Sequence, residues 1–455
     1  MRSLSQTTGK NALNEQTKLI VLAMPIFIEQ FLGVLLNNLD TLMISGYSQN
    51  AVGSVGNANM ILNLVNLIFN IIGVATGVVV SQYLGAKLFD KMDRVYSMTF
   101  ILNFGFGFAL SSALFLLARP ILNLIGVPAE LMPDAVSYMR IVGGTMFLQA
   151  GFNVMIQILR CNGLQRIGVL IAFMMNVLNV VGNYCFLFGP LAFLELGVAG
   201  VAISTSVSRV LALTVALVVF FSEKLGKIKL SELVPFDFGL LQRILRVGIP
   251  SAGESISYSL YQIVLLSFVN EMGTDSINAR IYCNTLMAFA VVFGSSVATA
   301  SQIITGYLIG AGKPNEAYKR IVRYCLICIP VAIFLTSINW LATPFTFKLF
   351  TDNQNVIDLS FKIMFVAIFL EIGRTLNMII LNSLKATGDV RFFAIVSVLC
   401  MWGVGLGGGY LFGVVLKFGV VGIFMGTALD ELCRGICYAV RWKHKRWMKH
   451  IDKIE

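Results

Sequence analysis

Residues 19–46 read LIVLAMPIFIEQFLGVLLNNLDTLMISG, an apolar run long enough to cross a lipid bilayer as a helix, which takes about 20 residues. The run also contains Pro25, Glu29 and Asp40. At about 100° per residue the two acids and Asn37 share one helix face, with the acids about 16 Å apart. An acid facing lipid is costly, so this face should meet protein or a water-filled cavity. A structural ion pair and a functional site both fit this pattern, and carboxylates inside membranes favour the second.

The composition is that of a membrane protein. Of 455 residues, 57% are hydrophobic and 13% are charged, against about 25% charged residues in soluble domains. The net charge of +11 therefore indicates an excess of cytoplasmic Lys and Arg rather than a nucleic-acid partner. The first 18 residues are polar and the first apolar run is too long for a signal core, so we expect no cleavable signal peptide.

Cysteine and histidine usage argues against catalysis. The pair Cys325-x-x-Cys328 matches a redox motif but lies inside an apolar segment, so we interpret it as helix packing. The two histidines, His444 and His450, both lie in the basic tail. The spans contain no Ser/His/Asp set, metal cluster or phosphate loop, which disfavours an integral membrane enzyme.

Hydrophobic runs predict an all-α polytopic membrane protein with about twelve spans. Their expected limits are 17–44, 52–84, 95–118, 134–158, 167–188, 198–222, 243–270, 280–309, 321–342, 358–383, 392–415 and 419–441. We expect an N-terminal lobe over residues 1–222, a cytoplasmic linker over 223–242, and a C-terminal lobe with a basic cytoplasmic tail over 243–455.

The distribution of Lys and Arg predicts the orientation. The side that holds both termini carries 25 of these residues, and three lie inside spans. The other side carries six, namely Arg119, Arg140, Arg280, Lys348, Lys362 and Lys417. The positive-inside rule therefore places both termini in the cytoplasm.

The second half of the chain repeats the first. Pro250 and Glu254 follow Pro25 and Glu29 at an offset of 225 residues. The same offset relates Gly85-Ala86 to Gly310-Ala311 and Leu159-Arg160 to Leu384-Lys385, and an offset of 222 relates Gly197 to Gly419. Six spans per repeat give both copies the same topology, so we expect two pseudo-symmetric six-helix lobes about an axis along the membrane normal.

These motifs resemble the multidrug and toxic compound extrusion (MATE) family. The resemblance rests on Pro25-x-x-x-Glu29 with Asp40, on Gln82-x-x-Gly85-Ala86, on Asn179-x-x-x-Asn183, and on their echoes in the second half, over roughly residues 17 to 442. It implies the MATE/MOP-type transporter fold. It also implies a plasma-membrane antiporter that exports drugs, often organic cations, in exchange for protons or sodium by alternating access of two lobes.

The resemblance implies an N-lobe cation site at Asp40, Asn179, Asn183 and Thr205. Some members have an aspartate at the position of Asn183, so one carboxylate is left here. A sodium ion, if one binds, is expected at Asp40, and we expect no other metal and no cofactor. The C-lobe cation site of the sodium-coupled branch has no matching acids at its usual places.

Further substrate or cation candidates come from the spans themselves. They are Glu29 and Asn37, the stripe of Glu254, Tyr258 and Tyr261, and the pair of Glu371 and Arg374 at i and i+3. A carboxylate beside two phenols suits an organic cation, and the less favoured alternative is an acid that is hydrogen-bonded to neighbouring helices. Glu371 and Arg374 form either a structural pair or a switch. Pro25 and Pro250 are candidate hinges.

We therefore expect a cation-coupled exporter of small amphipathic compounds that works as a monomer in the bilayer. One alternative is a flippase for lipid-linked precursors in the same superfamily, which would need a strongly cationic cavity. A receptor is the remaining alternative, and the duplicated halves disfavour it.

The charge asymmetry makes a testable prediction. A fluorescent protein fused to the C-terminus should fluoresce, and alkaline phosphatase at the same place should be inactive, because phosphatase requires export. High phosphatase activity would contradict both the span count and the repeat.

Overall fold

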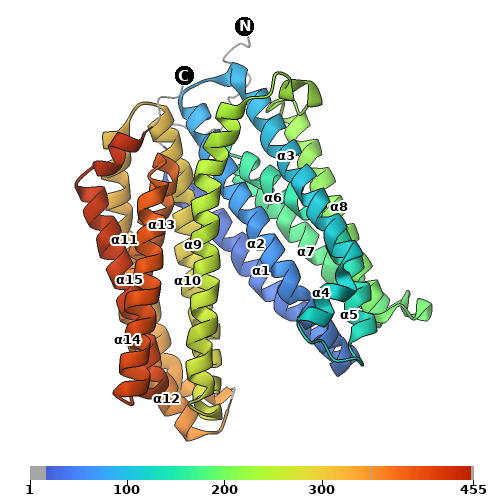
Figure 1. Cartoon of the computed structure of the whole chain (residues 1–455), viewed down its shortest axis with the longest axis vertical. Helices are drawn as coiled ribbons and strands as arrows, with labels where there is room; N and C mark the ends of the chain where they lie inside the picture. The colour runs from blue at the N-terminus through green and yellow to red at the C-terminus, as the bar shows by residue number, and fades with distance from the viewer. Residues whose placement is uncertain (1–16, 350, 452–455) are drawn as a thin grey trace. The chain divides into compact units, whose positions relative to one another are not determined.

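The computed structural model describes residues 17–349 and 351–451, except for the side chains of Asn37, Leu349 and His450. Its regular elements in this range are all helical, with no strand (Figure 1). The expected all-α architecture is therefore confirmed. The order and length of the helices are also similar in the two halves.

From residue 17 onward, the first half contains eight α-helices and three short π or 3-10 segments. Their bounds are α1 Leu19–Tyr47, α2 Gln49–Gly85, α3 Phe89–Leu116, α4 Ala118–Leu124, α5 Met132–Tyr138, η2 Met139–Gly143, α6 Met146–Cys161, α7 Gln165–Leu187, η3 Ala192–Leu194, α8 Gly197–Ser222 and η4 Leu230–Leu233.

In its described residues, up to 451, the second half contains seven α-helices. Its elements are α9 Phe238–Asn270, α10 Thr274–Gly310, α11 Pro314–Thr346, η5 Phe347–Leu349, α12 Gln354–Thr387, α13 Val390–Leu399, η6 Cys400–Leu406, α14 Gly407–Tyr410, η7 Leu411–Val415, α15 Gly419–Lys443 and η8 Arg446–His450. Eleven of the twelve expected spans coincide with one helix or with one unbroken run of helical segments within the described residues, and the fourth is interrupted between Gly143 and Met146. Several helices run beyond their expected limits, since amphipathic ends continue the helix outside the apolar core.

Eight helices within the described residues are long and apolar enough to span a membrane on their own. A ninth span results if Met132–Gly143 and Met146–Cys161, which meet at a bend of 43°, count as one. The three other expected spans, α9, α12 and α15, are not in this group, and they carry the charged residues Glu254, Glu371, Arg374, Asp430, Glu431 and Arg434.

The chain divides into two compact units. Unit 1 contains Met24–Leu84 and Leu88–Leu245, and unit 2 contains Gly85–Lys87 and the residues from Arg246 onward, together with the described residues before Met24. Thus α1 passes from unit 2 into unit 1 just before Pro25, and α9 passes from unit 1 into unit 2 four residues before Pro250. The segment 223–242, expected as a linker, belongs to unit 1, where the Lys227 N–H donates to Asp93 of α3 at 2.9 Å.

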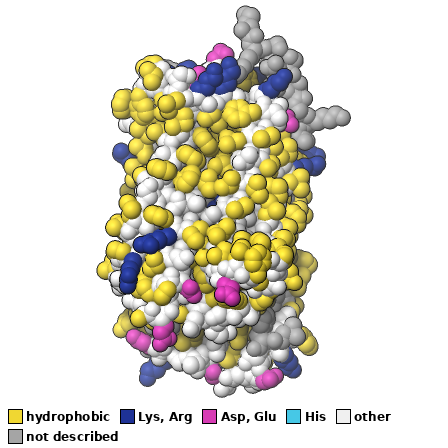
Figure 2. Space-filling model, turned by 90° about the vertical axis from the view of Figure 1, so that its right-hand side faces the viewer, with side chains coloured by type: hydrophobic (Ala, Val, Ile, Leu, Met, Phe, Trp, Pro, Cys, Tyr) yellow, Lys and Arg dark blue, Asp and Glu magenta, His cyan; other side chains and the backbone are white. Residues whose placement is uncertain are grey.

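Each unit has its own apolar core. In unit 1, Phe69, Leu122 and Met139 are fully buried, and in unit 2, Ile363, Leu370 and Met401 are fully buried. Large hydrophobic side chains also lie exposed over the helices, as in Phe108, Leu211 and Phe334. Yellow hydrophobic atoms dominate the face drawn in Figure 2, as expected for a surface that meets lipid tails.

Helices α12 and α15 approach so closely that glycine is required. A Cβ added at Gly373 would lie 2.5 Å from the backbone nitrogen of Leu432, and this nitrogen cannot move away as a flexible side chain could. The close approach brings the charged residues of these two helices together.

We therefore expect Gly373→Ala to lower the stability of the purified protein by about 1–3 kcal/mol, the usual cost of overpacking. The matched control is Gly105→Ala in α3, where nothing lies within 4 Å of the added Cβ. There alanine should be neutral or should stabilise the helix by up to about 1 kcal/mol. Thermal unfolding in detergent measures both, and equal melting temperatures would contradict the close packing.

Candidate functional site

Asp40 lies in a polar cluster that is built by three helices of unit 1. The Asn183 side-chain amide of α7 donates to Asp40 Oδ1 at 3.1 Å. On the same helix Asn179 donates to Thr205 Oγ1 of α8 at 3.0 Å. Asp40 is half-buried, whereas Asn183 is only 1% exposed. The structure thus brings together the four residues that the resemblance pointed to.

One hydrogen-bond acceptor of the cluster, the side-chain oxygen of Asn183, has no donor. Asn183 Oδ1 is buried and has no hydrogen-bond partner. Buried polar atoms are nearly always satisfied, so an unpaired oxygen needs an explanation. Together with the Asp40 carboxylate it offers the oxygen ligands that a hard cation prefers, or an acceptor for a proton carried by Asp40.

Two residues that the sequence analysis did not assign complete this region. Tyr138 of α5 is 6% exposed and lies against Asn59 and Thr205. Arg209 of α8 is close to Tyr138, and its Nη1 contacts the sulfur of Met146 at 3.4 Å. Because Arg209 follows Thr205 by one helical turn, its presence on the same face could have been read from the spacing.

Glu29, one turn after Pro25, is not free. Arg160, near the end of α6, donates from Nη2 to both oxygens of Glu29 at 2.7 Å. Both side chains are only 11–15% exposed. The ion pair fixes the part of α1 that follows the proline to the helix that ends the fourth expected span. Asn37 lies in α1 as well, but its side chain is outside the described residues.

The same ion pair recurs in unit 2 at the repeat offset of 225 residues. Glu254, one turn after Pro250, lies 3.8 Å from Lys385, near the end of α12. Glu254 and Lys385 are the counterparts of Glu29 and Arg160. Both halves therefore carry an acid one turn beyond the kink proline, and in both a basic residue of the fourth span holds it.

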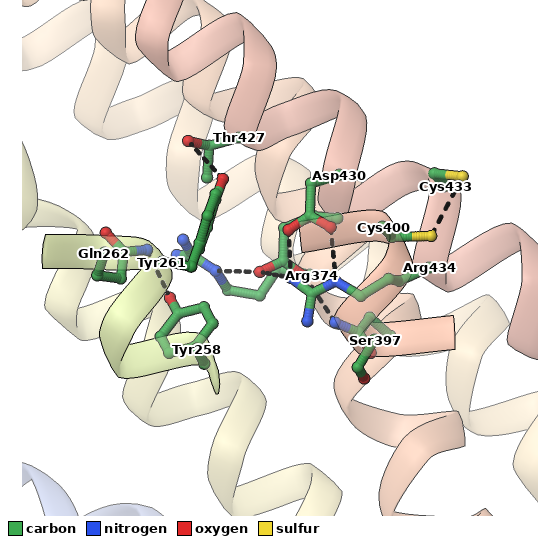
Figure 3. Close-up of polar contacts among 12 residues, drawn as sticks. Tyr258, Tyr261, Gln262, Arg374, Ser397, Cys400, Thr427, Asp430, Cys433 and Arg434 are labelled. Atoms are coloured by element: carbon green, nitrogen blue, oxygen red, sulfur yellow. Dashed lines mark hydrogen bonds and ion pairs between the residues drawn. The ribbon is translucent and has the colours of Figure 1, made fainter. Parts of the chain in front are cut away.

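The two tyrosines of the expected Glu254 stripe have partners of their own. Tyr261 is fully buried and its hydroxyl donates to Thr427 at 3.5 Å. The Tyr258 hydroxyl accepts from Gln262 at 3.1 Å, and Arg280 donates to the same Gln262 at 3.3 Å. Figure 3 shows both rings on α9 beside the charged cluster of unit 2. Within the described part of the chain, no hydrogen bond or ion pair joins Glu254 to either tyrosine.

Glu371 and Arg374 belong to a network that is larger than a pair. Arg374 donates to Glu371 at 2.5 Å and lies 3.9 Å from Glu431 of α15. Glu431 also pairs with Arg434 at 2.9 Å and accepts from Asn377 at 2.7 Å. Arg434 makes a two-bond pair with Asp430, at 2.7 and 3.0 Å (Figure 3).

This network joins three carboxylates to two guanidiniums. The acids Glu371, Asp430 and Glu431 are at most 3% exposed. Burying a charge is costly unless it is paired, so the excess acid makes the network sensitive to proton or cation binding. Within the described residues no group of three or more acids, cysteines or histidines has the arrangement of a metal site.

Comparison with known proteins identifies the family. The MatE family model matches residues 25–185 and 250–411, so it is repeated in the two halves. The chain is 35% identical, over 97% of both chains, to the "Uncharacterized transporter YisQ" of Bacillus subtilis. It is 23% identical, over 94% of this chain and 95% of the relative, to a "Probable multidrug resistance protein NorM" of Streptococcus pneumoniae.

Solved structures share the fold. An "Outward-facing conformation of a multidrug resistance MATE family transporter of the MOP superfamily" superposes with a TM-score of 0.86. It is 20% identical, and the superposition covers 99% of both chains. The expected architecture of a MATE/MOP-type transporter is therefore confirmed.

The excess of acid in unit 2 predicts an asymmetric response to mutation. Arg374→Gln leaves three buried acids with one guanidinium and should cost about 3–5 kcal/mol of stability. Glu371→Gln balances the network at two acids and two guanidiniums and should cost far less. The double variant should recover most of the loss, because it restores the excess of one acid.

Thermal unfolding of the three purified variants in detergent measures this asymmetry. If the two single changes cost the same and only the double variant recovers, Glu371 and Arg374 form an isolated pair and the larger network has no energetic role.

Proposed function

This chain belongs to the MATE family of transporters, and on that premise we propose that it exports amphipathic, often cationic, organic compounds in exchange for protons or sodium ions. Curated relatives that bear the name of multidrug resistance proteins support the substrate class. We place the protein in the plasma membrane with both termini in the cytoplasm, as the charge asymmetry of the loops favours.

The observation that carries the coupling proposal is the environment of Asp40. Its hydrogen-bond partner, Asn183, is neutral, and no ion pair joins its carboxylate to a described cation. A half-buried carboxylate without a counter-charge is less stable than one in water. Binding a proton or a sodium ion removes that cost, and the vacant Asn183 Oδ1 supplies a further ligand.

Coupling requires that ion and drug favour different states of the protein. In our proposal Asp40 takes up the ion from the outside and releases it to the cytoplasm, where the charged form favours drug capture. Pro25 has no backbone N–H to donate within α1, so the helix can bend there at low cost as the charge on Asp40 changes. The two lobes then alternate access to the two sides.

Glu254 is our candidate for contact with a cationic substrate. Its ion pair with Lys385 is long, at 3.8 Å, and the Lys385 ammonium also lies 5.4 Å from the centre of the Phe393 ring. Lys385 can therefore withdraw toward the ring when an organic cation takes its place on the carboxylate, with cation–π attraction compensating part of the loss. Glu29, bound by Arg160 at 2.7 Å, lacks this freedom.

Asp40→Asn tests the coupling proposal, because it fixes the side chain in a neutral form. We expect normal expression and detergent stability, loss of efflux, and dye affinity that no longer changes between acidic and alkaline pH. The measurements are transport in proteoliposomes with pH and sodium gradients imposed separately, and dye binding at both pH values.

The matched control is Asp352→Asn, an exposed aspartate in the second half, which should transport and respond to pH as wild type does. Wild-type efflux with an unchanged pH response in Asp40→Asn would show that Asp40 is not the coupling group and would move the role to the acids of unit 2.

A further inference from the structure

A pocket of about 420 Å³ opens on unit 1 between α4 and the segment that begins α5, and none of Asp40, Asn179, Asn183 and Thr205 lines it. Its lining comprises Arg119, Asn123, Val127, Ala129, Met132, Pro133, Val136 and Arg140. Figure 1 shows α4 and α5 at the lower end of unit 1. Two residues of the lining, Val127 and Met132, also belong to the buried core of the unit, so core packing holds this side of the pocket in place.

The polar groups of this lining carry positive charge or can donate hydrogen bonds, and no acid is among them. Arg119 and Arg140 bring two guanidiniums to one pocket, and Asn123 brings an amide. Neither arginine has an ion-pair partner within the described part of the chain. The nearby acids Glu130 and Asp134 are exposed and outside the lining.

These two arginines lie on the side of the membrane where Lys and Arg are scarce. Only six Lys or Arg fall on the side assigned to the outside, and Arg119 and Arg140 are the two of them in unit 1. Two positive charges in one pocket repel each other unless an anion lies between them. The pair of arginines therefore indicates an anionic ligand.

The expected position of the pocket along the membrane normal is that of a lipid headgroup. Arg140 precedes the cytoplasmic-side Arg160 by 20 residues of mostly helical chain, about 30 Å, which is the thickness of the hydrocarbon core. Leu116, Leu117 and Leu124, beside the pocket, are 71%, 50% and 87% exposed. A phosphate at the arginines would thus sit at the outer interface with acyl chains against these leucines.

We propose that this pocket binds the headgroup of an anionic phospholipid of the outer leaflet. Arg119 and Arg140 hold the phosphate through charge-assisted hydrogen bonds, for which the planar guanidinium is suited. Asn123 donates to the headgroup, and Val127 and Val136 contact its apolar part. The proposal concerns binding to the purified protein and does not depend on transport.

The test is thermal unfolding of the detergent-purified full chain with added short-chain lipid. Dihexanoyl phosphatidylglycerol should raise the unfolding temperature of wild type, whereas dihexanoyl phosphatidylcholine and inorganic phosphate should not. Arg119→Gln/Arg140→Gln should need about tenfold or more phosphatidylglycerol for the same shift, since two charge-assisted bonds are lost.

The matched control is Lys348→Gln/Lys362→Gln, which removes two exposed outer-side cations that do not line the pocket. It should respond as wild type does. An unchanged response in the arginine double variant would overturn the proposal. A full response to inorganic phosphate would overturn the lipid assignment in favour of a free anion. If the double variant does not fold, Arg119→Gln and Arg140→Gln, tested singly, should each weaken the response, and no loss in either would overturn it.

Discussion

A carboxylate that leaves water needs an opposite charge nearby, and this constraint organises both halves of the protein. Glu29 and Glu254 each follow a kink proline by one turn and are largely buried in a membrane-spanning helix, where an unpaired acid is costly. Each is held by a basic residue from the end of the fourth span, Arg160 or Lys385. The ion pairs fix the start of each half while the prolines before them stay free to bend.

The two halves share this ion pair but differ in the polar side chains at other equivalent positions. Residue 209 of α8 and residue 431 of α15 are equivalent by the 222-residue offset, yet one is arginine and the other glutamate. Around Arg209 unit 1 has tyrosine, asparagine and threonine, with Asp40 as a single acid held by a neutral amide. Around Glu431 unit 2 has a dense charged network. Asp40 is bonded to a neutral amide and forms no ion pair with a described cation, so its charge can change without breaking an ion pair, whereas a change of charge in unit 2 alters a network of ion pairs.

Hydrophobic runs predicted the helices well, because lipid exposure imposes a long apolar stretch on most spans, although α9, α12 and α15, which carry buried charges, are less apolar. The expected 198–222 became Gly197–Ser222, and 419–441 became Gly419–Lys443. The partners of charged residues were harder to predict. Glu254 was expected beside Tyr258 and Tyr261, its neighbours on one helix, but it pairs with Lys385, a distant residue in the sequence. Such pairs depend on how helices rotate and pack against each other. The signal was nevertheless present, because both members of each pair repeat at 225 residues.

The repetition of the Glu29–Arg160 pair at Glu254–Lys385 bears on the evolution of the protein. A shared interaction whose two partners both recur in register is most simply inherited from one ancestral gene, which encoded a single half and doubled later. Such an ancestor would have held its own first helix in place by this ion pair. Asp40 has no counterpart, since the equivalent residue is the buried Leu265. By this account the ion pair is older than the fusion of the halves, and the asymmetry between Asp40 and Leu265 arose only once each half could mutate separately.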